Sequence, residues 1–355
     1  MIISKTPFRV SFFGGGTDYP EHFTKHGGAV LGTAIDKSTY LAATHFYSHL
    51  FDYSIRLAYR QVECVSDLES IQHAPLRECL RWTGITKDIE LDCMAELPSS
   101  TGLGTSSSFV VGVLSALYAF QGRVVHPLDI AYQAIEIERD VLHEAVGCQD
   151  QTLAALGGFN LIEFHTTRDI VVHRMPLSAE RLNEFERHLL LVYTGIRRRA
   201  SQVAAGQIKK IDRNTAQLKQ MRRQVDDGYD ILAGGKSLTQ FGKLLHEGWV
   251  LKNSLCDSVS NDQIDLVYRQ GMQAGALGGK LLGAGGGGFI LLFVPPERRE
   301  AVTAALGHLE SIPFQVNAPG TQIIHASMRD GPGLRTAPYD RASGDKASDD
   351  RVRAA

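Results

Sequence analysis

The sequence predicts an α+β fold with two lobes. Segments with strand-like composition dominate the first third of the 355-residue chain, helical segments follow, and short strands return late. Hydrophobic residues make up 43% of the chain, which is enough for a substantial core. We place an N-terminal lobe at residues 1–185 and a C-terminal lobe at residues 186–330. The tail, 331–355, is rich in Gly, Ser, Asp and Arg, and we expect it to be disordered.

The individual elements follow from periodicity and from turn residues. Apolar and polar residues alternate cleanly at 88–95, which indicates a strand with one buried face. The other predicted strands are 2–13, 35–46, 189–193, 289–294 and 322–326, and 54–65 is one strand or a hairpin. The segment 109–120 is apolar nearly all round, which indicates a buried helix. The other predicted helices are 128–144, 238–255, 264–276 and 297–309, and the charged stretch 201–233 is also helical.

Charge and cysteine content argue against several classes of protein. The formal net charge of −2 disfavours a general nucleic-acid binder, which usually carries a basic excess. Five scattered cysteines without a CxxC pair argue against a disulfide framework or a zinc site and fit a reducing, cytoplasmic compartment. The longest apolar run, 289–294, is far shorter than the roughly 20 residues of a membrane helix. We therefore expect neither a nucleic acid nor a membrane as partner.

The sequence PSSTGLGTSSS, at residues 98–108, predicts a phosphate-binding loop ahead of the helix 109–120. Glycines let the backbone approach a ligand closely, and a helix start offers unpaired N–H groups to an anion. The serine and threonine hydroxyls are suited to phosphate or to Mg²⁺. The loop lacks the lysine of the GxxxxGK[ST] motif, so a serine N-cap after a flexible turn is the open alternative.

A second glycine cluster, KLLGAGGGG at residues 280–288, precedes the predicted strand 289–294. Successive glycines are costly in conformational entropy. They are typical of places where a ligand or another chain segment approaches the backbone closely. We expect this cluster to approach the phosphate-binding loop or its ligand, and the alternative is a tight turn with a bulge.

Three motifs in this order resemble those of the GHMP kinases, named for the galacto-, homoserine, mevalonate and phosphomevalonate kinases. The motifs are TPFRVSFFGGGTDYP at 6–20, PSSTGLGTSSS, and KLLGAGGGGF at 280–289. A fourth match, VGCQDQTLAALGGF at 146–159, resembles the segment that carries the catalytic aspartate of the family. The resemblance implies ATP-dependent phosphoryl transfer to a small-molecule hydroxyl. It also implies an N-terminal lobe similar to a ribosomal-protein-S5-like domain and a ferredoxin-like C-terminal lobe.

The resemblance implies a role for each residue that matches a family motif. Asp150 would accept the proton of the attacking hydroxyl or position it, and Arg9 would stabilise developing negative charge. Ser106 and Glu138 would bind Mg²⁺, with Glu136 as the alternative to Glu138 because the match needs a one-residue gap. Without these roles, Asp150 would be a solvated loop residue and Arg9 a surface residue of a strand. The two glutamates would then lie on an exposed helix face. The expected ATP contacts are Ser100, Thr101, Gly102, Leu103, Gly104, Thr105, Ser106 and Ser107.

Expected substrate contacts lie in three segments. Thr17 and Asp18 match the sugar-binding TDY of galactokinase-like members. Gly15 and Gly16 stand where those members have Glu-His, which argues against galactose and for a bulkier or differently oriented sugar. The run 197–199, three arginines, would suit an acceptor that already carries a phosphate, or would be a solvated basic turn. The full set is Gly15, Gly16, Thr17, Asp18, Arg197, Arg198, Arg199, Gly285, Gly286 and Gly287.

Taken together, the motifs are most similar to the bacterial members that phosphorylate the anomeric hydroxyl of D-glycero-D-manno-heptose 7-phosphate, on the way to GDP-heptose for surface polysaccharide. The resemblance thus implies ATP, Mg²⁺ and a small-molecule sugar phosphate as ligands, and leaves a homodimer open. The alternatives are another anomeric sugar kinase, such as an L-fucose kinase or a galactokinase-like enzyme, and a catalytically inactive sugar sensor. A decarboxylase acting on a phosphorylated mevalonate is disfavoured by the TDY sequence.

Overall fold

An eight-stranded sheet forms the frame of the N-terminal lobe in the computed structural model, which describes residues 1–196 and 200–327. Its centre is the long antiparallel pair β1 (Ile2–Phe13) and β2 (Gly28–His45). Beyond β2 the order continues with β5 (Ile89–Ala95), β3 (Ile55–Ala58) and β4 (Val62–Val65). Another part of β2 pairs with β6 (Phe159–Phe164), which pairs in turn with β7 (Ile170–Arg174).

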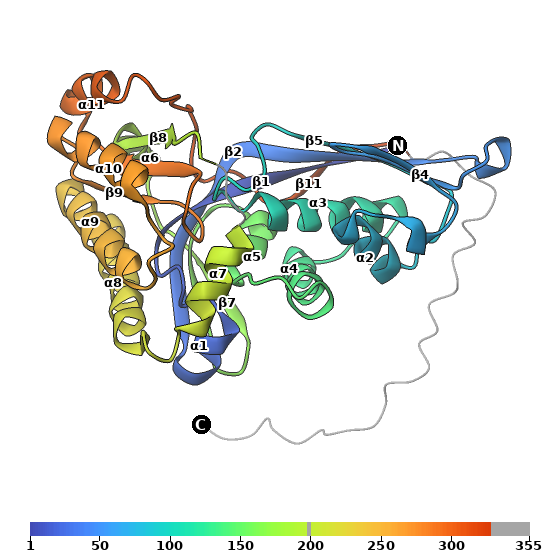
Figure 1. The fold of residues 1–355 in the computed structure, drawn as a ribbon, viewed down its shortest axis with the longest axis horizontal. Helices are drawn as coiled ribbons and strands as arrows, with labels where there is room; N and C mark the ends of the chain where they lie inside the picture. The colour runs from blue at the N-terminus through green and yellow to red at the C-terminus, as the bar shows by residue number, and fades with distance from the viewer. Residues whose placement is uncertain (197–199, 328–355) are drawn as a thin grey trace.

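Helices cover one face of this sheet (Figure 1). The apolar helix α3 (Thr105–Phe120) packs on β1 and β2 and forms much of the core there, as its composition predicts. The helices that surround it are α2 (Ala74–Thr83), α4 (Pro127–Glu136) and α5 (Gln149–Leu156). The short helix α1 (Pro20–His26) joins β1 to β2. Because α3 begins at the phosphate-binding loop, the sheet and its helices fix the position of that loop.

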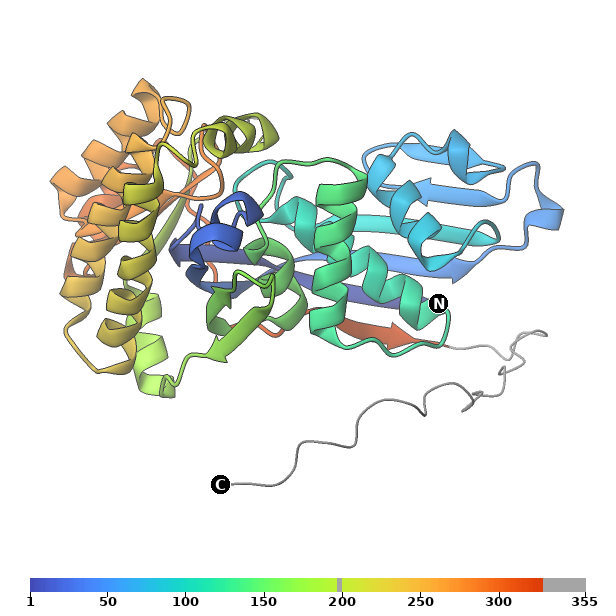
Figure 2. The ribbon, with the colours of Figure 1, turned by 90° about the horizontal axis from the view of Figure 1, so that it is seen from below.

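The C-terminal lobe is a three-stranded antiparallel sheet covered by helices. Its order is β8 (Leu189–Tyr193), β10 (Phe289–Phe293) and β9 (Gly278–Leu281). Helix α9 packs on β9, and α8 lies beside α9 (Figure 2). The helices of this lobe are α6 (Ala179–Arg187), α7 (Ala200–Lys209), α8 (Thr215–Ala233), α9 (Leu238–Ser254), α10 (Asp262–Ala274) and α11 (Arg299–Ala305).

The two lobes share a core. The ring of Phe12, from β1, lies 5.3 Å from that of Phe185, in α6, and 5.6 Å from that of Phe241, in α9. Helix α6 packs with the C-terminal lobe although most of it precedes the boundary that we expected at residue 185. The last described strand, β11 (Gln322–Ala326), returns to the N-terminal sheet and pairs with β1, although it lies within the segment we assigned to the C-terminal lobe. These contacts hold the walls of the space between the lobes in fixed positions.

Most elements expected from the sequence are present, with informative differences. The segment 54–65 is the hairpin of β3 and β4. The expected helix 128–144 changes to π-helical geometry at Ile137–Val141, and 201–233 is divided into α7 and α8. Sequence reasoning did not predict the elements α1, α2, α5, α6, β6, β7 and β9. No helix in the described residues has both the length and the apolar character needed to cross a membrane. The tail 331–355 and the run 197–199 lie outside the described residues.

Candidate active site

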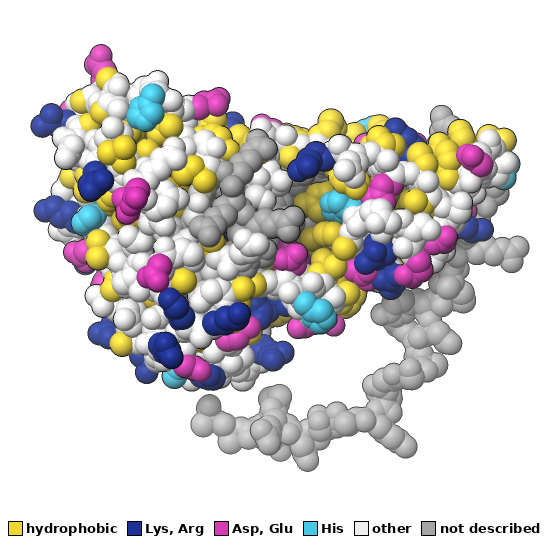
Figure 3. Space-filling view, viewed as in Figure 1, with side chains coloured by type: hydrophobic (Ala, Val, Ile, Leu, Met, Phe, Trp, Pro, Cys, Tyr) yellow, Lys and Arg dark blue, Asp and Glu magenta, His cyan; other side chains and the backbone are white. Residues whose placement is uncertain are grey.

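A cleft of about 550 Å³ lies where the lobes meet. The space-filling view shows the hollow between them, with hydrophobic side chains on its N-terminal side (Figure 3). Its walls include the loop after β1, the phosphate-binding loop and the start of α5. Lys252, Lys280 and Gly283 line it from the C-terminal lobe. All four sequence motifs, which are spread over residues 6–289 of the chain, therefore meet in one cavity.

The phosphate-binding loop turns into α3 at Gly104, whose φ of +71° favours glycine. No side chain caps this helix start. Gly104 also lies directly against the base of the cleft, because a Cβ there would be 3.1 Å from Arg9 Cγ and 3.2 Å from Asp150 Oδ2. The expected ATP contacts that line the cleft are Ser100, Gly102, Gly104, Thr105, Ser106 and Ser107. A helix start with free amides beside an open cleft is suited to an anion.

The two glycine clusters touch, as the sequence predicts. A Cβ on Gly283 would lie 2.6 Å from the Cα of Gly102, and one on Gly288 would lie 2.2 Å from the carbonyl oxygen of Thr101. The amide of Phe289 donates to the same Thr101 oxygen at 3.1 Å. The second cluster is thus a backbone support for the phosphate-binding loop, and the tight-turn alternative does not describe it.

Arg9 and Asp150 form a partly buried, bidentate ion pair at the base of the cleft. Arg9 Nε donates to Asp150 Oδ1 at 2.7 Å, and Nη2 donates to Oδ2 at 2.6 Å. Arg9 Nη1 also donates to the carbonyl oxygen of Gly102 at 2.6 Å, so the same guanidinium holds both the carboxylate and the loop. The side chain of Asp150 is 23% exposed. A carboxylate has about four acceptor positions, so Asp150 can still accept a hydrogen bond from a group in the cleft.

Asp18 is the second carboxylate of the cleft. It is 1% exposed and accepts hydrogen bonds from the amides of Gly16 at 2.9 Å and Gln149 at 3.3 Å. Burial raises the pKa of Asp18, and repulsion from Asp150 raises it further, although the two amide hydrogen bonds oppose this. Asp18 and Asp150 thus lie close enough to act on one small acceptor molecule.

Glu138 lies behind the phosphate-binding loop on the π-helical segment. It is buried, accepts a hydrogen bond from Gln151 Nε2 at 2.6 Å, and is also hydrogen-bonded to Ser107. Burial raises the pKa of Glu138 to about 7. The alternative residue, Glu136, is exposed. Ser106 is exposed at the cleft, so Ser107 is the serine that meets Glu138.

Several expected site residues do not line the cleft. The hydroxyl of Thr17 donates to the carbonyl oxygens of Gly14 and Ala29 at 2.8 and 2.9 Å, which is a structural role. Thr101 and Leu103 belong to the loop itself, but both are fully buried. The glycines 285–287 are also absent from the lining; Gly285 packs on the backbone of Val259, and Gly287 on that of Ile196. The arginines 197–199 lie outside the described residues, so their expected phosphate contact stays a prediction.

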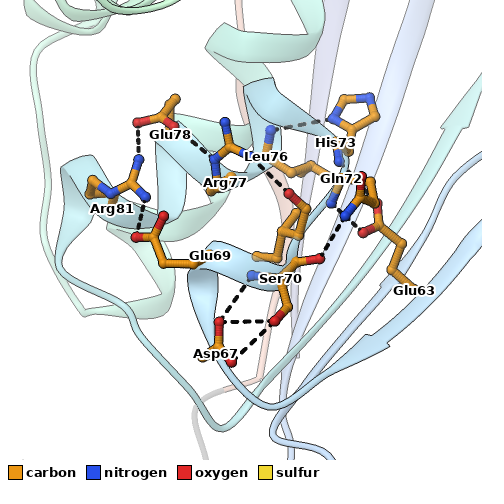
Figure 4. A network of polar contacts seen from close by, with 11 residues as sticks. Glu63, Asp67, Glu69, Ser70, Gln72, His73, Leu76, Arg77, Glu78 and Arg81 are labelled. Carbon is orange, nitrogen blue, oxygen red and sulfur yellow. Dashed lines mark hydrogen bonds and ion pairs between the residues drawn. The ribbon is translucent and has the colours of Figure 1, made fainter.

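The structure also brings side chains to the cleft that sequence reasoning missed. Phe109 and His73 line its apolar part, with their ring centroids 5.3 Å apart. Figure 4 shows how His73 is held at the start of α2: its Nδ1 accepts from the Leu76 amide at 3.3 Å, and Glu63 accepts from the His73 amide at 3.1 Å. Burial lowers the pKa of His73, which favours the neutral ring. Lys252 and Lys280 also line the cleft, and both are cationic residue types.

Two family models match the chain: the GHMP kinases N terminal domain at residues 71–158 and the GHMP kinases C terminal domain at residues 229–309. The chain belongs to the GHMP kinase family. It is a sugar kinase of this family, a phosphotransferase with an alcohol acceptor, and GHMP kinases use ATP as their phosphoryl donor.

Relatives of this GHMP kinase cover nearly its whole length. A Campylobacter jejuni protein named D-glycero-alpha-D-manno-heptose 7-phosphate kinase is 29% identical over 334 residues, which span 88% of this chain and 96% of the relative. The crystal structure of a D-glycero-D-manno-heptose 1-phosphate kinase from Bacteroides thetaiotaomicron aligns with a TM-score of 0.75 and 25% identity, over 92% of this chain and 100% of that one. Lactococcus lactis galactokinase, at 18% identity and a TM-score of 0.71 over 91% and 95% of the chains, shares the fold.

Proposed function

We propose that this kinase transfers the γ-phosphoryl group of ATP to the anomeric hydroxyl of D-glycero-D-manno-heptose 7-phosphate and forms the 1,7-bisphosphate. The observation that carries the proposal is the Arg9–Asp150 pair at the base of a cleft beneath the start of α3. It combines a fixed carboxylate, a fixed cation and free helix amides in one place. Phosphoryl transfer requires mainly alignment and charge compensation, and these groups supply both.

ATP would bind with its phosphates on the amides of residues 104–107, at the start of α3. Its base would enter the apolar part of the cleft beside Phe109 and His73, because a neutral imidazole and a phenyl ring both favour contact with a flat aromatic base. The Arg9 guanidinium, which already supports Gly102 of the loop, is placed to stabilise negative charge on the transferring group.

The acceptor sugar would bind between Asp18 and Asp150. Asp18 has its position fixed by two amides and would accept hydrogen bonds from sugar hydroxyls. Asp150 would accept the proton of the attacking hydroxyl, on the part of its carboxylate that faces the cleft. Gly15 and Gly16 leave room for a large sugar because neither carries a side chain at this wall.

The residues behind the loop fit a Mg²⁺ ion. Burial raises the pKa of Glu138, and a bound cation would stabilise the ionised carboxylate. The hydroxyls of Ser106 and Ser107 lie nearby on α3. The described residues hold no group of three or more His, Cys, Asp or Glu side chains that could bind a metal. Mg²⁺ would therefore take its other ligands from water and phosphate oxygens, which is its usual behaviour. The ion would supply charge neutralisation on the phosphates.

The heptose 7-phosphate is chosen over other sugars on two grounds. The Campylobacter relative that carries this name aligns with this chain over most of both proteins. The absence of side chains at Gly15 and Gly16 also fits a sugar larger than galactose. We place the reaction in the cytoplasm, where ATP is available, and the five cysteines are all free thiols in the structure. The product would serve the synthesis of GDP-heptose for surface polysaccharide.

A panel assay tests the proposal. The purified kinase is given ATP, Mg²⁺ and, one at a time, heptose 7-phosphate, free heptose, L-fucose, galactose and mevalonate, and ADP release is recorded. The proposal predicts fast turnover with heptose 7-phosphate and a new anomeric phosphate in the ³¹P NMR spectrum of the product. Fast turnover with L-fucose or galactose alone would support the alternative sugar kinases. A protein that binds a sugar but releases no ADP with any acceptor would be a sensor.

A further inference from the structure

Two lysines reach the cleft from the C-terminal lobe. Lys252 comes from α9 and Lys280 from β9, and each is only 6% exposed. Both line the same cavity as Arg9, Asp18 and Asp150. A lysine that is more than nine-tenths buried is uncommon unless its charge is compensated. Two such lysines in one wall of the site therefore need an explanation.

The hydrogen bonds of these lysines go to neutral groups. Lys280 Nζ donates to the carbonyl oxygen of Phe12 at 2.8 Å. Lys252 Nζ donates to the carbonyl oxygens of Leu281, at 3.0 Å, and of Gly283. An ammonium group has three donors, so these contacts leave one on Lys252 and two on Lys280. Among the described residues of the cleft, the one ion pair is that of Arg9 with Asp150, and neither lysine has a carboxylate partner.

The cations of the cleft also act on one another. Burial lowers the pKa of Lys252 to about 7, and Arg9 adds to this effect, whereas Asp18 and Asp150 oppose it. Burial likewise lowers the pKa of Lys280 well below its usual value, with Lys252 and Arg9 adding to the shift. Arg9, Lys252 and Lys280 thus face Asp18 and Asp150, and Arg9 already engages Asp150. When both lysines are protonated, three cations face two carboxylates, so a bound anion would favour the protonated form of the lysines.

We propose that Lys252 and Lys280 form an anion site that binds the oxygens of a phosphate group of the substrates. This inference rests on the proposed kinase function and names residues for the phosphate contact. The phosphate comes either from the acceptor sugar or from the end of ATP, since both enter this cleft. Binding supplies the missing negative charge and satisfies the free ammonium donors with charge-assisted hydrogen bonds. The carbonyl contacts keep the two ammonium groups in position for that phosphate.

The site is also coupled to the phosphate-binding loop. Lys252 holds the carbonyls of Leu281 and Gly283, and Gly283 packs on Gly102. Lys280 connects β9 to the end of β1, just before the loop that carries Asp18. A phosphate on the two lysines would therefore lie against the segments that bind donor and acceptor.

The test compares variants that remove charge. Lys252→Met and Lys280→Met remove the charge and keep a long side chain. Lys252→Gln also removes the charge but keeps an N–H donor for the two carbonyls, which helps this variant to fold. Lys243→Met, at an exposed position of the same helix, is the control. Dissociation constants are measured by calorimetry for heptose 7-phosphate, for free heptose and for a nonhydrolysable ATP analogue, with thermal melting as the check on folding.

The expected result is a loss of about tenfold or more in affinity for one phosphate-bearing ligand, which is the scale of a charge-assisted hydrogen bond, and little change for free heptose. A loss confined to heptose 7-phosphate assigns the site to the acceptor, and a loss confined to the ATP analogue assigns it to the donor. Unchanged affinity for both ligands in folded Lys252→Gln and Lys280→Met would overturn the inference. If the wild-type kinase turns over no sugar phosphate, the proposed function fails, whereas the ATP-analogue arm still tests the lysines.

Discussion

The backbone of Gly147 lies directly against the carboxylate of Asp18. A Cβ at position 147 would stand 1.9 Å from Asp18 Oδ2, far inside any allowed contact. The neighbouring amide of Gln149 donates to the same carboxylate oxygen at 3.3 Å. The position of Asp18 in the cleft thus depends on the absence of a side chain in a segment 129 residues further along the chain.

We expect Gly147→Ala to impair acceptor binding selectively. The new methyl group must displace Asp18, and misplacement of a positioning group by about 1 Å can cost up to roughly a hundredfold in activity. The KM for the acceptor sugar should rise by about tenfold or more, whereas the KM for ATP should change little because the phosphate-binding loop is elsewhere. Steady-state kinetics with each substrate varied separately gives the answer.

The control for this substitution is Gly206→Ala. Gly206 lies in α7, and its added Cβ would come no closer than 3.6 Å to Cys256 Sγ, an ordinary contact. This variant should behave as the wild type. A folded Gly147→Ala kinase with an unchanged acceptor KM would show that Asp18 does not contact the sugar.

Asp150→Asn should abolish most turnover without loss of ATP binding. The amide cannot take up the proton of the attacking hydroxyl, and it accepts only one of the two Arg9 hydrogen bonds. Loss of a general base lowers kcat by about a hundredfold or more. Single-turnover kinetics measures the effect, and Asp227→Asn, at an exposed position of α8, serves as control. Turnover like that of the wild type in Asp150→Asn would remove Asp150 from the mechanism.

Sequence reasoning succeeded where the chemistry of a position is dictated locally. The two glycine clusters were expected to meet because bare backbone is needed where segments cross, and Gly102 and Gly283 do touch. The motifs also brought Arg9 and Asp150 to one cleft, although 141 residues separate them. Strands with clear alternation or a continuous apolar run, such as β5, β8 and β10, lie within a residue of their expected positions.

The misses have a common physical cause, which is that tertiary contacts decided the outcome. Strand β9 has the sequence GGKL, which has low strand propensity and forms because β10 offers a partner. Lysine is expected on the surface, so nothing local indicates that Lys252 is buried. Lys280 is the first residue of the second glycine cluster, and a charged side chain beside a predicted ligand-binding segment is a signal for a site residue. Thr17 belongs to the TDY sequence expected to bind the sugar, yet its hydroxyl donates to backbone carbonyl oxygens instead.

Substitution of Glu138 or of its serine partner should weaken Mg²⁺ binding. We expect Glu138→Gln to raise the half-saturating Mg²⁺ concentration, and Ser107→Ala to raise it by about tenfold, because loss of a group that orients a metal ligand costs 10- to 100-fold in affinity. Ser106→Ala tests the alternative that the exposed serine is the direct ligand. Mg²⁺ binding in the presence of ADP, followed by thermal melting, gives a readout independent of turnover.

The matched control is Glu136→Gln, an exposed glutamate two residues earlier. Its Mg²⁺ requirement should equal that of the wild type. The reverse pattern, a changed Mg²⁺ requirement in Glu136→Gln and an unchanged one in Glu138→Gln, would assign the ion to Glu136.

The stability of the ligand-free kinase should depend on pH through Lys252. Its pKa is about 7 in the folded chain, mainly because of burial, and 10.5 is its ordinary value in an unfolded one. Below pH 7 both states are protonated, and the folded state bears the full cost of the buried charge. Between pH 7 and pH 10.5 the unfolded chain binds the extra proton, so this contribution to the free energy of unfolding rises with pH.

Urea denaturation of wild type and Lys252→Met at several pH values isolates this contribution. The free energy of unfolding of the wild type should increase relative to that of the variant as the pH rises from about 6.5 to about 9.5, since methionine has no proton to exchange. The free energy of unfolding of the wild type should be lowest, relative to that of the variant, at the most acidic pH of this range. Lys243→Met, at an exposed position of α9, is measured alongside as the control. A constant difference for Lys252→Met would mean that Lys252 keeps its ordinary proton affinity in the fold, and that the cleft already compensates its charge without a phosphate.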